Sequence, residues 1–274
     1  MLYSRFFSGL SLARHCRLAK LFILDRLARS SYRSMTATDL AEKRKSDTVF
    51  VFGTGASLLD ISSSQWAAIS QHDVVSFREF HRQRFVHADF HITAEVDDVD
   101  DYARSIRSNP FYNNCCYLIQ EGWLAERGNE IVGRRLLPDG VPVVRYKRKS
   151  RGVSAAPSRM FEQGIVHGHG SICGVTNICL ILGWKRIVLC GIDLYDHRQF
   201  YMPPNETRSI EKEGVTFASR YASADQIVDL IGDWADLCRD DGREIYALNP
   251  KSLLTRRLPT FDLSTLPEAP NKNG

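Results

Sequence analysis

The stretch TVFVFGTGASLLDI, residues 48–61, begins with five residues typical of a buried strand and continues into a glycine-rich turn. Gly53 and Gly55 allow a tight turn, and Ser57 is available to cap a helix that would follow. Strand, turn and helix in this order are the first unit of an α/β protein. Glycines here also let a phosphate approach backbone N–H groups at a helix N-terminus, and a purely structural turn is the alternative. The stretch has neither the GxGxxG pattern nor the lysine of an ATPase loop.

The same alternation continues toward the C-terminus. Further apolar runs predict strands at 73–77, 88–96, 115–120, 141–147, 185–193 and 243–250. Helical patterns lie between them at 62–71, 98–107, 171–184 and 224–242. Alternating strands and helices predict a doubly wound, mainly parallel sheet with helices on both faces.

Length and composition set the frame for this sheet. The chain has 274 residues, of which 43% are hydrophobic and 25% charged, as in ordinary globular proteins. We expect an N-terminal segment over 1–46, one catalytic domain over 47–260 and a flexible tail over 261–274. Seven cysteines without a CxxC motif argue against a disulfide framework or a zinc ribbon and favour a reducing cytoplasm.

The excess of positive over negative charge lies in the N-terminal segment. Residues 1–45 hold ten Lys or Arg against three acids, whereas the remainder holds 26 against 29, so no nucleic-acid partner is indicated. Its leucines are interleaved with Arg and Lys, and no apolar run is long enough to span a membrane. We expect residues 1–34 to form a basic amphipathic helix on an anionic membrane surface, at its inner, cytoplasmic face. An organelle-import presequence and a helix packed on the domain are the alternatives.

Two polar motifs suggest chemistry. EVDDVDD (95–101) contains Asp98-Val99-Asp100, a spacing that can hold a divalent cation, although the solvated start of a helix is the more frequent use. HGHGS (167–171) supplies two histidines, too few for a metal site, so we predict no metal. His169 and Ser171 would line a glycine-rich active-site loop, with a flexible loop as the alternative.

VLCGIDLYDHRQFY (188–201) is a strand broken by Gly191 and followed by polar and aromatic side chains. Such a strand end often builds a site at the carboxyl edge of a parallel sheet. The residues of interest here are Asp193, Tyr195, His197 and Tyr201.

Three blocks in this order resemble the bacterial sialyltransferases of glycosyltransferase family 42 over residues 48–258. They are GTGASL (53–58), the segment from Ser171 to Tyr195 that ends in LGWKRIVLCGIDLY, and PKSLL (250–254). A wider group of GxGxSL proteins, which includes flagellin-modifying proteins and pterin diphosphokinases, shares the outline. Thr54 and Arg78 stand where the family has asparagine.

The resemblance implies a Rossmann-like domain that binds a CMP-activated sugar, inverts its anomeric carbon and needs no metal or other cofactor. It implies that Tyr195 and Tyr201 contact the departing phosphate. The family's catalytic histidine is missing, because no His follows His197. His197 or His169 would replace it, and Tyr221 is the nearest counterpart by spacing. The expected donor-binding residues are Gly53, Thr54, Gly55, Ser57, Arg78, His169, Ser171, Gly191 and Asp193.

The expected function is therefore transfer of sialic acid or a related keto-sugar from CMP to a glycan or glycolipid acceptor at the cell surface. A pterin-type diphosphokinase using ATP and magnesium is one alternative. A non-catalytic domain that binds a nucleotide or glycan is another. The sequence does not indicate whether the protein is a homo-oligomer.

Overall fold

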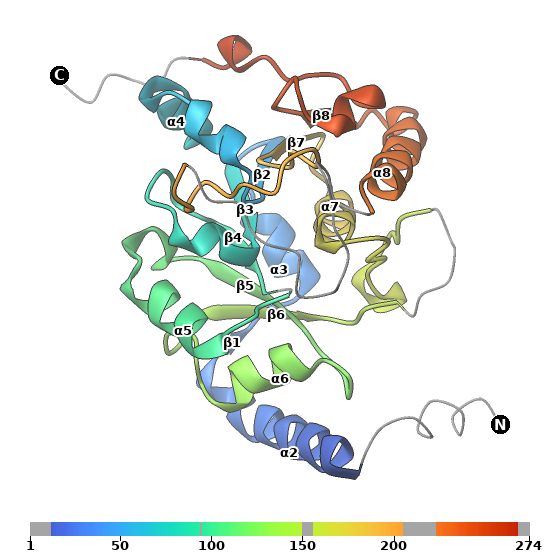
Figure 1. Ribbon diagram of the computed structural model, residues 1–274. Coiled ribbons are helices and arrows are strands. Elements are labelled where there is room, and N and C mark those ends of the chain that lie inside the picture. The colour runs from blue at the N-terminus through green and yellow to red at the C-terminus, as the bar shows by residue number, and fades with distance from the viewer. Residues whose placement is uncertain (1–11, 94, 150–155, 205–222, 268–274) are drawn as a thin grey trace.

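The computed structural model describes residues 12–93, 95–149, 156–204 and 223–267. Within these ranges the chain forms an eight-stranded sheet in which all neighbouring strands are parallel (Figure 1). In chain order the strands are β1 (Arg33–Ser34), β2 (Thr48–Phe52), β3 (Asp73–Phe77), β4 (Phe90–Ile92), β5 (Cys116–Gln120), β6 (Pro142–Tyr146), β7 (Arg186–Cys190) and β8 (Glu244–Ala247). The fold is a Rossmann-like α/β fold with an N-terminal helix, as predicted.

Helices cover both faces of the sheet. They are α2 (Leu12–Ala28), α3 (Ala37–Glu42), α4 (Ser63–Ile69), α5 (Val99–Ser108), α6 (Glu126–Gly133), α7 (Ser171–Leu182) and α8 (Ala224–Arg239). Alternate residues of each strand point to opposite faces, so each face has its own core. On β2, Val49 and Val51 pack with α3, α7 and α8, whereas Phe50 and Phe52 pack with α4, α5 and α6.

The order of the strands creates one switch point. Across the sheet it is β1-β6-β5-β4-β3-β2-β7-β8. Val51 of β2 is paired with Val75 of β3 on one side and with Leu189 of β7 on the other. The chain continues from β2 toward one edge of the sheet and from β7 toward the other, so the connections that follow these two strands lead in opposite directions across the sheet. Ligands of open α/β sheets bind in the crevice at such a point.

All strands predicted from 48–52 to 243–250 are present, but three elements were missed. The N-terminal segment expected over 1–46 contains β1 and α3, and Thr36 and Asp39 form a capping box at the start of α3. The third missed element, α6, packs its middle residues against the sheet.

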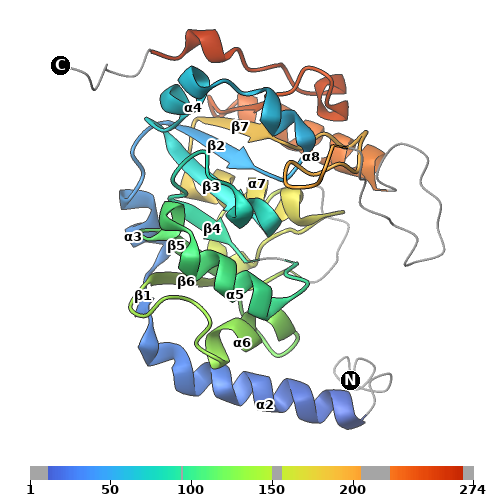
Figure 2. The same ribbon diagram turned by 60° about the vertical axis from the view of Figure 1, so that its left-hand side comes forward.

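The N-terminal segment is part of the packed body from Leu12 onward. Figure 2 shows α2 running along the outer side of α6. Leu18 and Leu21 of α2 are buried, and β1 extends the sheet at its edge by pairing with β6. None of the helices in the described ranges combines the length and apolar character that a membrane-spanning segment requires.

The C-terminal segment also packs on the body beyond residue 260. The ring of Phe261 lies edge-on to Phe50, with 5.7 Å between ring centroids, and Leu266 is buried. The packed part of the chain therefore extends at least to Leu266.

Candidate functional site

A hollow of about 280 Å³ lies at the switch point, at the carboxyl ends of the strands. Its walls are residues 53–55 after β2, 77–78 at the end of β3, 169–172 at the start of α7 and 191–194 after β7. Glu95, Asp196, Ser223 and Ile227 complete the described lining. We call it the switch hollow.

The two turns that meet at the switch hollow are fastened to each other. The N–H of Gly53 donates to Cys190 O at 2.9 Å, and the N–H of Gly55 donates to Gly191 O at 2.8 Å. A side chain at Gly55 would overlap the Asp193 carboxylate and place its Cβ 2.8 Å from Gly191 O. These glycines are therefore required by the close approach of the two turns, and their N–H groups are already used.

The prediction that Ser57 caps a helix is wrong. Ser57 lies inside a short 3₁₀ turn, Ala56–Asp60, and the helix α4 begins only after Ser62, which caps it. Ser57 instead donates to Asp193 from its N–H at 3.1 Å and from its hydroxyl at 2.5 Å. Asn249 donates to the same carboxylate at 2.8 Å. Asp193 thus joins the turn after β2, its own turn and the end of β8.

Strained backbone is concentrated around the switch hollow. Arg78, Glu95 and Leu194 have φ values of 55°, 58° and 61°, and all three line it. Arg135, after α6, is the one other residue besides glycine with positive φ in the described ranges. Such conformations cost free energy and persist where the surrounding structure enforces them, which is frequent at functional sites.

The start of α7 lines this hollow and holds a buried hydroxyl without a partner among the described residues. Ser171 is 4% exposed, and its hydroxyl has no hydrogen-bond partner among the described residues. Gly170 precedes the helix and supplies no side-chain cap. The first N–H groups of a helix lack partners within it, and the helix dipole favours an anion there.

Arg78 is the only Lys or Arg among the described residues that line the hollow. Its Nη1 lies 3.3 Å from Glu95 Oε2, and its Nε lies 3.7 Å from Glu79 Oε2. The Nε has no hydrogen-bond partner in the described part of the chain. His167 Nε2 also lies 3.7 Å from Glu95 Oε1, so Glu95 stands between a histidine and the arginine.

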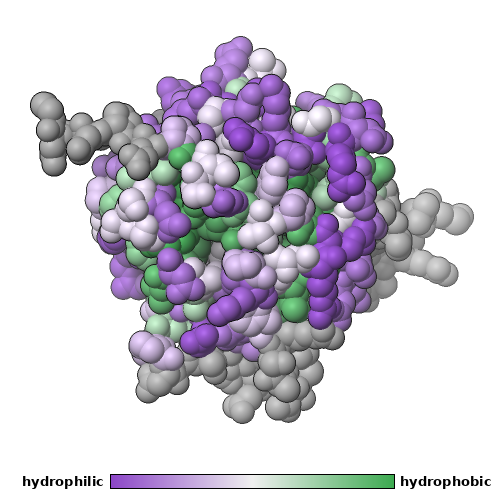
Figure 3. Space-filling view, turned by 90° about the horizontal axis from the view of Figure 1, so that it is seen from above, coloured by the Kyte–Doolittle hydropathy of each residue, from purple (hydrophilic) through white to green (hydrophobic). Residues whose placement is uncertain are grey.

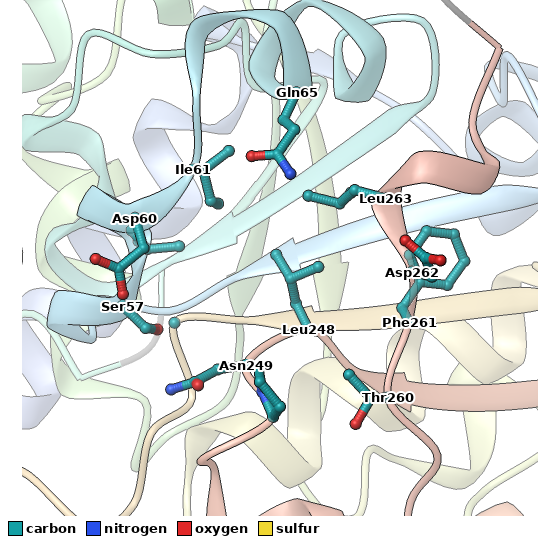
Figure 4. A pocket seen from close by; sticks show the side chains of 13 residues that line it. Ser57, Asp60, Ile61, Gln65, Leu248, Asn249, Thr260, Phe261, Asp262 and Leu263 are labelled. Carbon is teal, nitrogen blue, oxygen red and sulfur yellow. The ribbon is translucent and has the colours of Figure 1, made fainter.

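The predicted donor-binding residues largely come together. Eight of the nine line the switch hollow, namely Gly53, Thr54, Gly55, Arg78, His169, Ser171, Gly191 and Asp193. The ninth, Ser57, lines a second hollow of about 390 Å³, which shares Gly191 with the switch hollow. Figure 4 shows this second hollow, in which side chains of Ala56–Asp60 and α4 face those of the C-terminal segment.

The residues predicted to be catalytic are not part of the described lining of the switch hollow. The Tyr195 hydroxyl accepts a hydrogen bond from Asn249 at 3.2 Å, and partial burial raises the pKa of this phenol above its ordinary value, so it stays protonated at neutral pH. Tyr201 lines a third hollow, about 420 Å³ in volume, and its ring lies 5.6 Å from the Arg82 guanidinium. His197, which lies between these two tyrosines in the sequence, is half-buried. Tyr221 lies outside the described residues.

The acidic motif at 95–101 is used within the fold. Asp98 caps α5 by accepting from the N–H groups of Asp100 and Asp101 at 2.9 and 3.0 Å. Asp100 pairs with Arg134 at 2.5 Å, and Asp101 pairs with Arg82. No group of three His, Cys, Asp or Glu in the described ranges is arranged to hold a metal ion.

Glu95 is one of the lining residues that sequence reasoning missed. It follows β4 closely, as Arg78 follows β3, so the rule that sites lie at carboxyl strand ends would have found it.

Comparison with models of protein families gives no match for this chain, and comparison with curated proteins gives none.

Proposed function

We propose that the protein is an inverting glycosyltransferase that takes sialic acid or a related keto-sugar from a CMP-activated donor. The observation that carries the proposal is the gathering of eight motif-derived residues in one hollow at the switch point. The same hollow contains a helix N-terminus, a buried free hydroxyl and an arginine. These are the groups that bind a phosphate.

In the proposed reaction, negative charge grows on the phosphate as its bond to the anomeric carbon breaks. Ser171, the start of α7 and Arg78 would stabilise that charge, because donors already in place need no reorganisation during the reaction. The acceptor hydroxyl must lose its proton to a base. His169 is exposed at the hollow and His197 is not part of its described lining, so we assign this role to His169.

We further propose that the acceptor is a surface glycan or glycolipid and that the protein works at the inner face of an anionic membrane. The support for this location is α2, which exposes leucines and an isoleucine beside basic residues. An enzyme attached to the membrane would meet a lipid-linked acceptor more often than a freely diffusing enzyme would.

The donor site can be tested by measuring the binding of CMP without metal. We expect CMP at about 100 times its dissociation constant to raise the free energy of unfolding by about 2.7 kcal/mol. Ser171→Ala should weaken CMP binding about tenfold, because the phosphate loses a hydroxyl donor.

Thr176→Val is the matched control on the same helix. The Thr176 hydroxyl is also buried without a hydrogen-bond partner among the described residues, but it does not line the hollow. It should leave CMP affinity unchanged. Binding of magnesium-ATP in place of CMP would contradict the proposal and favour the diphosphokinase.

A further inference from the structure

The helix α2 has an inner face that belongs to the fold. Leu18, Leu21, Asp25 and Ala28 are buried along it. The Asp25 carboxylate accepts from Arg29 at 2.8 Å and from Arg145 of β6 at 2.7 Å. A side chain at Gly133 would come within 2.8 Å of Leu24 Cβ, so α2 and α6 are in close contact. The helix is therefore held rigidly on the body.

The outer face of the same helix is apolar and uncovered. Leu12, Ile23 and Leu27 are 80%, 57% and 70% exposed, and Cys16 between them is exposed as well. Successive helical residues are about 100° apart, which places these four side chains within roughly 60° of one another. Single exposed leucines are ordinary, but a continuous apolar strip is typical of a surface that binds something. We call these four residues the outer strip.

Within α2, the charged side chains beside the outer strip are positive. The same helical geometry places Lys20 and Arg26 about 60° to either side of its centre. The only acid in α2 is Asp25, which is buried on the opposite face. Figure 3 shows the end of the molecule opposite α2, where hydrophobic residues reach the surface in patches between hydrophilic ones.

We propose that the outer strip docks on an anionic membrane surface, with α2 staying packed on the protein. The leucines would enter the boundary between headgroups and acyl chains, and Lys20 and Arg26 would contact the acidic headgroups. A second copy of this chain fits less well, because a symmetric contact would bring the same cations against each other. The inference does not depend on the chemistry of the switch hollow.

Vesicle co-sedimentation of the full chain tests this docking surface. The protein should bind vesicles of phosphatidylcholine with 30% phosphatidylglycerol and bind pure phosphatidylcholine weakly. The triple variant L12Q/I23Q/L27Q should lower binding about a hundredfold, because it removes the apolar contacts. The double variant K20Q/R26Q should lower it about thirtyfold on anionic vesicles only.

The matched control is L59Q/L237Q, which changes two leucines that are 59% and 54% exposed on other elements. It should bind vesicles as the parent does. If the parent does not bind anionic vesicles, or the triple variant binds them equally well, the proposal is overturned. A parent dimer that the triple variant converts to a monomer, without vesicle binding, would assign the strip to self-association and overturn it as well. Neither readout uses a donor sugar, so a failed CMP test leaves this inference standing.

Discussion

Arg78 combines a backbone conformation that most residues avoid with a charge that the site needs. Its φ of 55° is in the left-handed region, which asparagine adopts more readily than arginine. Arg78→Asn should therefore leave the melting temperature unchanged or slightly higher. It should weaken CMP binding by about 10- to 100-fold, because the lining loses its guanidinium. Calorimetric titration with CMP and thermal unfolding of the same sample measure both effects.

Tyr201 provides the contrast to Arg78. Its ring belongs to the third hollow, so Tyr201→Phe should leave CMP affinity unchanged within about twofold. The family resemblance implies the opposite, because it assigns this hydroxyl to the phosphate. If Tyr201→Phe weakens CMP binding as strongly as Arg78→Asn does, the phosphate lies nearer the tyrosines than the switch hollow indicates.

At the scale of elements, the packing of α2 depends on one buried carboxylate. Asp25 is fully buried and shared between Arg29 and Arg145. Asp25→Asn keeps the shape of the side chain but leaves two arginines without their main counter-charge. Breaking a buried ion pair in this way typically costs about 3–5 kcal/mol. Urea unfolding should show this loss, and limited proteolysis should cut α2 before the sheet.

Asp47→Asn is the control for this prediction, because Asp47 pairs with Lys185 at 2.8 Å on the surface. An exposed pair contributes little to stability, so the unfolding midpoint should stay where it is. If both variants unfold at the same urea concentration as the parent, Asp25 does not anchor α2.

Periodicity predicted the elements better than it predicted the site. Strands such as 48–52 and 73–77 are mainly apolar and buried along their whole length, because each is covered by helices on both faces. In contrast, α6 is eight residues long and includes Gly128 and Asn129, so its sequence carries no clear helical pattern. The structural role of Gly53 and Gly55 depends on contacts with the turn after β7, more than 130 residues away. No local pattern contains that information.

The acidic motif and His169 lie where their favoured interpretations placed them, because Asp98 caps a helix and His169 lines a hollow. The two tyrosines after β7 were harder to place from the sequence. Tyr195 and Tyr201 follow the same strand, but their side chains lie in different surroundings. Tyr195 bonds to Asn249, whereas Tyr201 lines the third hollow. Side-chain direction after a strand depends on the backbone of the turn, which the spacing of residues does not determine.

At the scale of the whole molecule, the outer strip and the switch hollow lie far apart. Five strand spacings separate β1, near α2, from β2, which at about 4.8 Å each is roughly 24 Å. If α2 lies on a membrane and the switch hollow is the transfer site, the acceptor must extend well beyond the headgroups. A glycan chain several sugars long meets this requirement, and a single headgroup sugar does not.

Two neutral histidines buried under α5 make the stability of the whole protein sensitive to acid. Burial, with the charge of Arg82 as a smaller cause, lowers the pKa of His81 to about 3. Burial also holds the pKa of His91 well below its ordinary value, with His81 as the smaller cause. In the unfolded chain both would titrate near pH 6.5. Their contribution to stability is therefore fully present above about pH 6.5 and is lost as the pH falls below it.

Between pH 6.5 and 5.0 the unfolded chain takes up a proton at His81 and the folded chain does not, which should lower the free energy of unfolding by roughly 2 kcal/mol. His91 acts in the same direction. Urea unfolding at pH 7.5, 6.5 and 5.0 measures this slope. His81 pairs through Nδ1 with the Ser105 hydroxyl at 2.8 Å, and a glutamine there can keep a hydrogen bond without titrating. His81→Gln should therefore lose roughly 2 kcal/mol of this pH dependence. An equal slope in the parent and in His81→Gln would mean that other groups cause the sensitivity to acid.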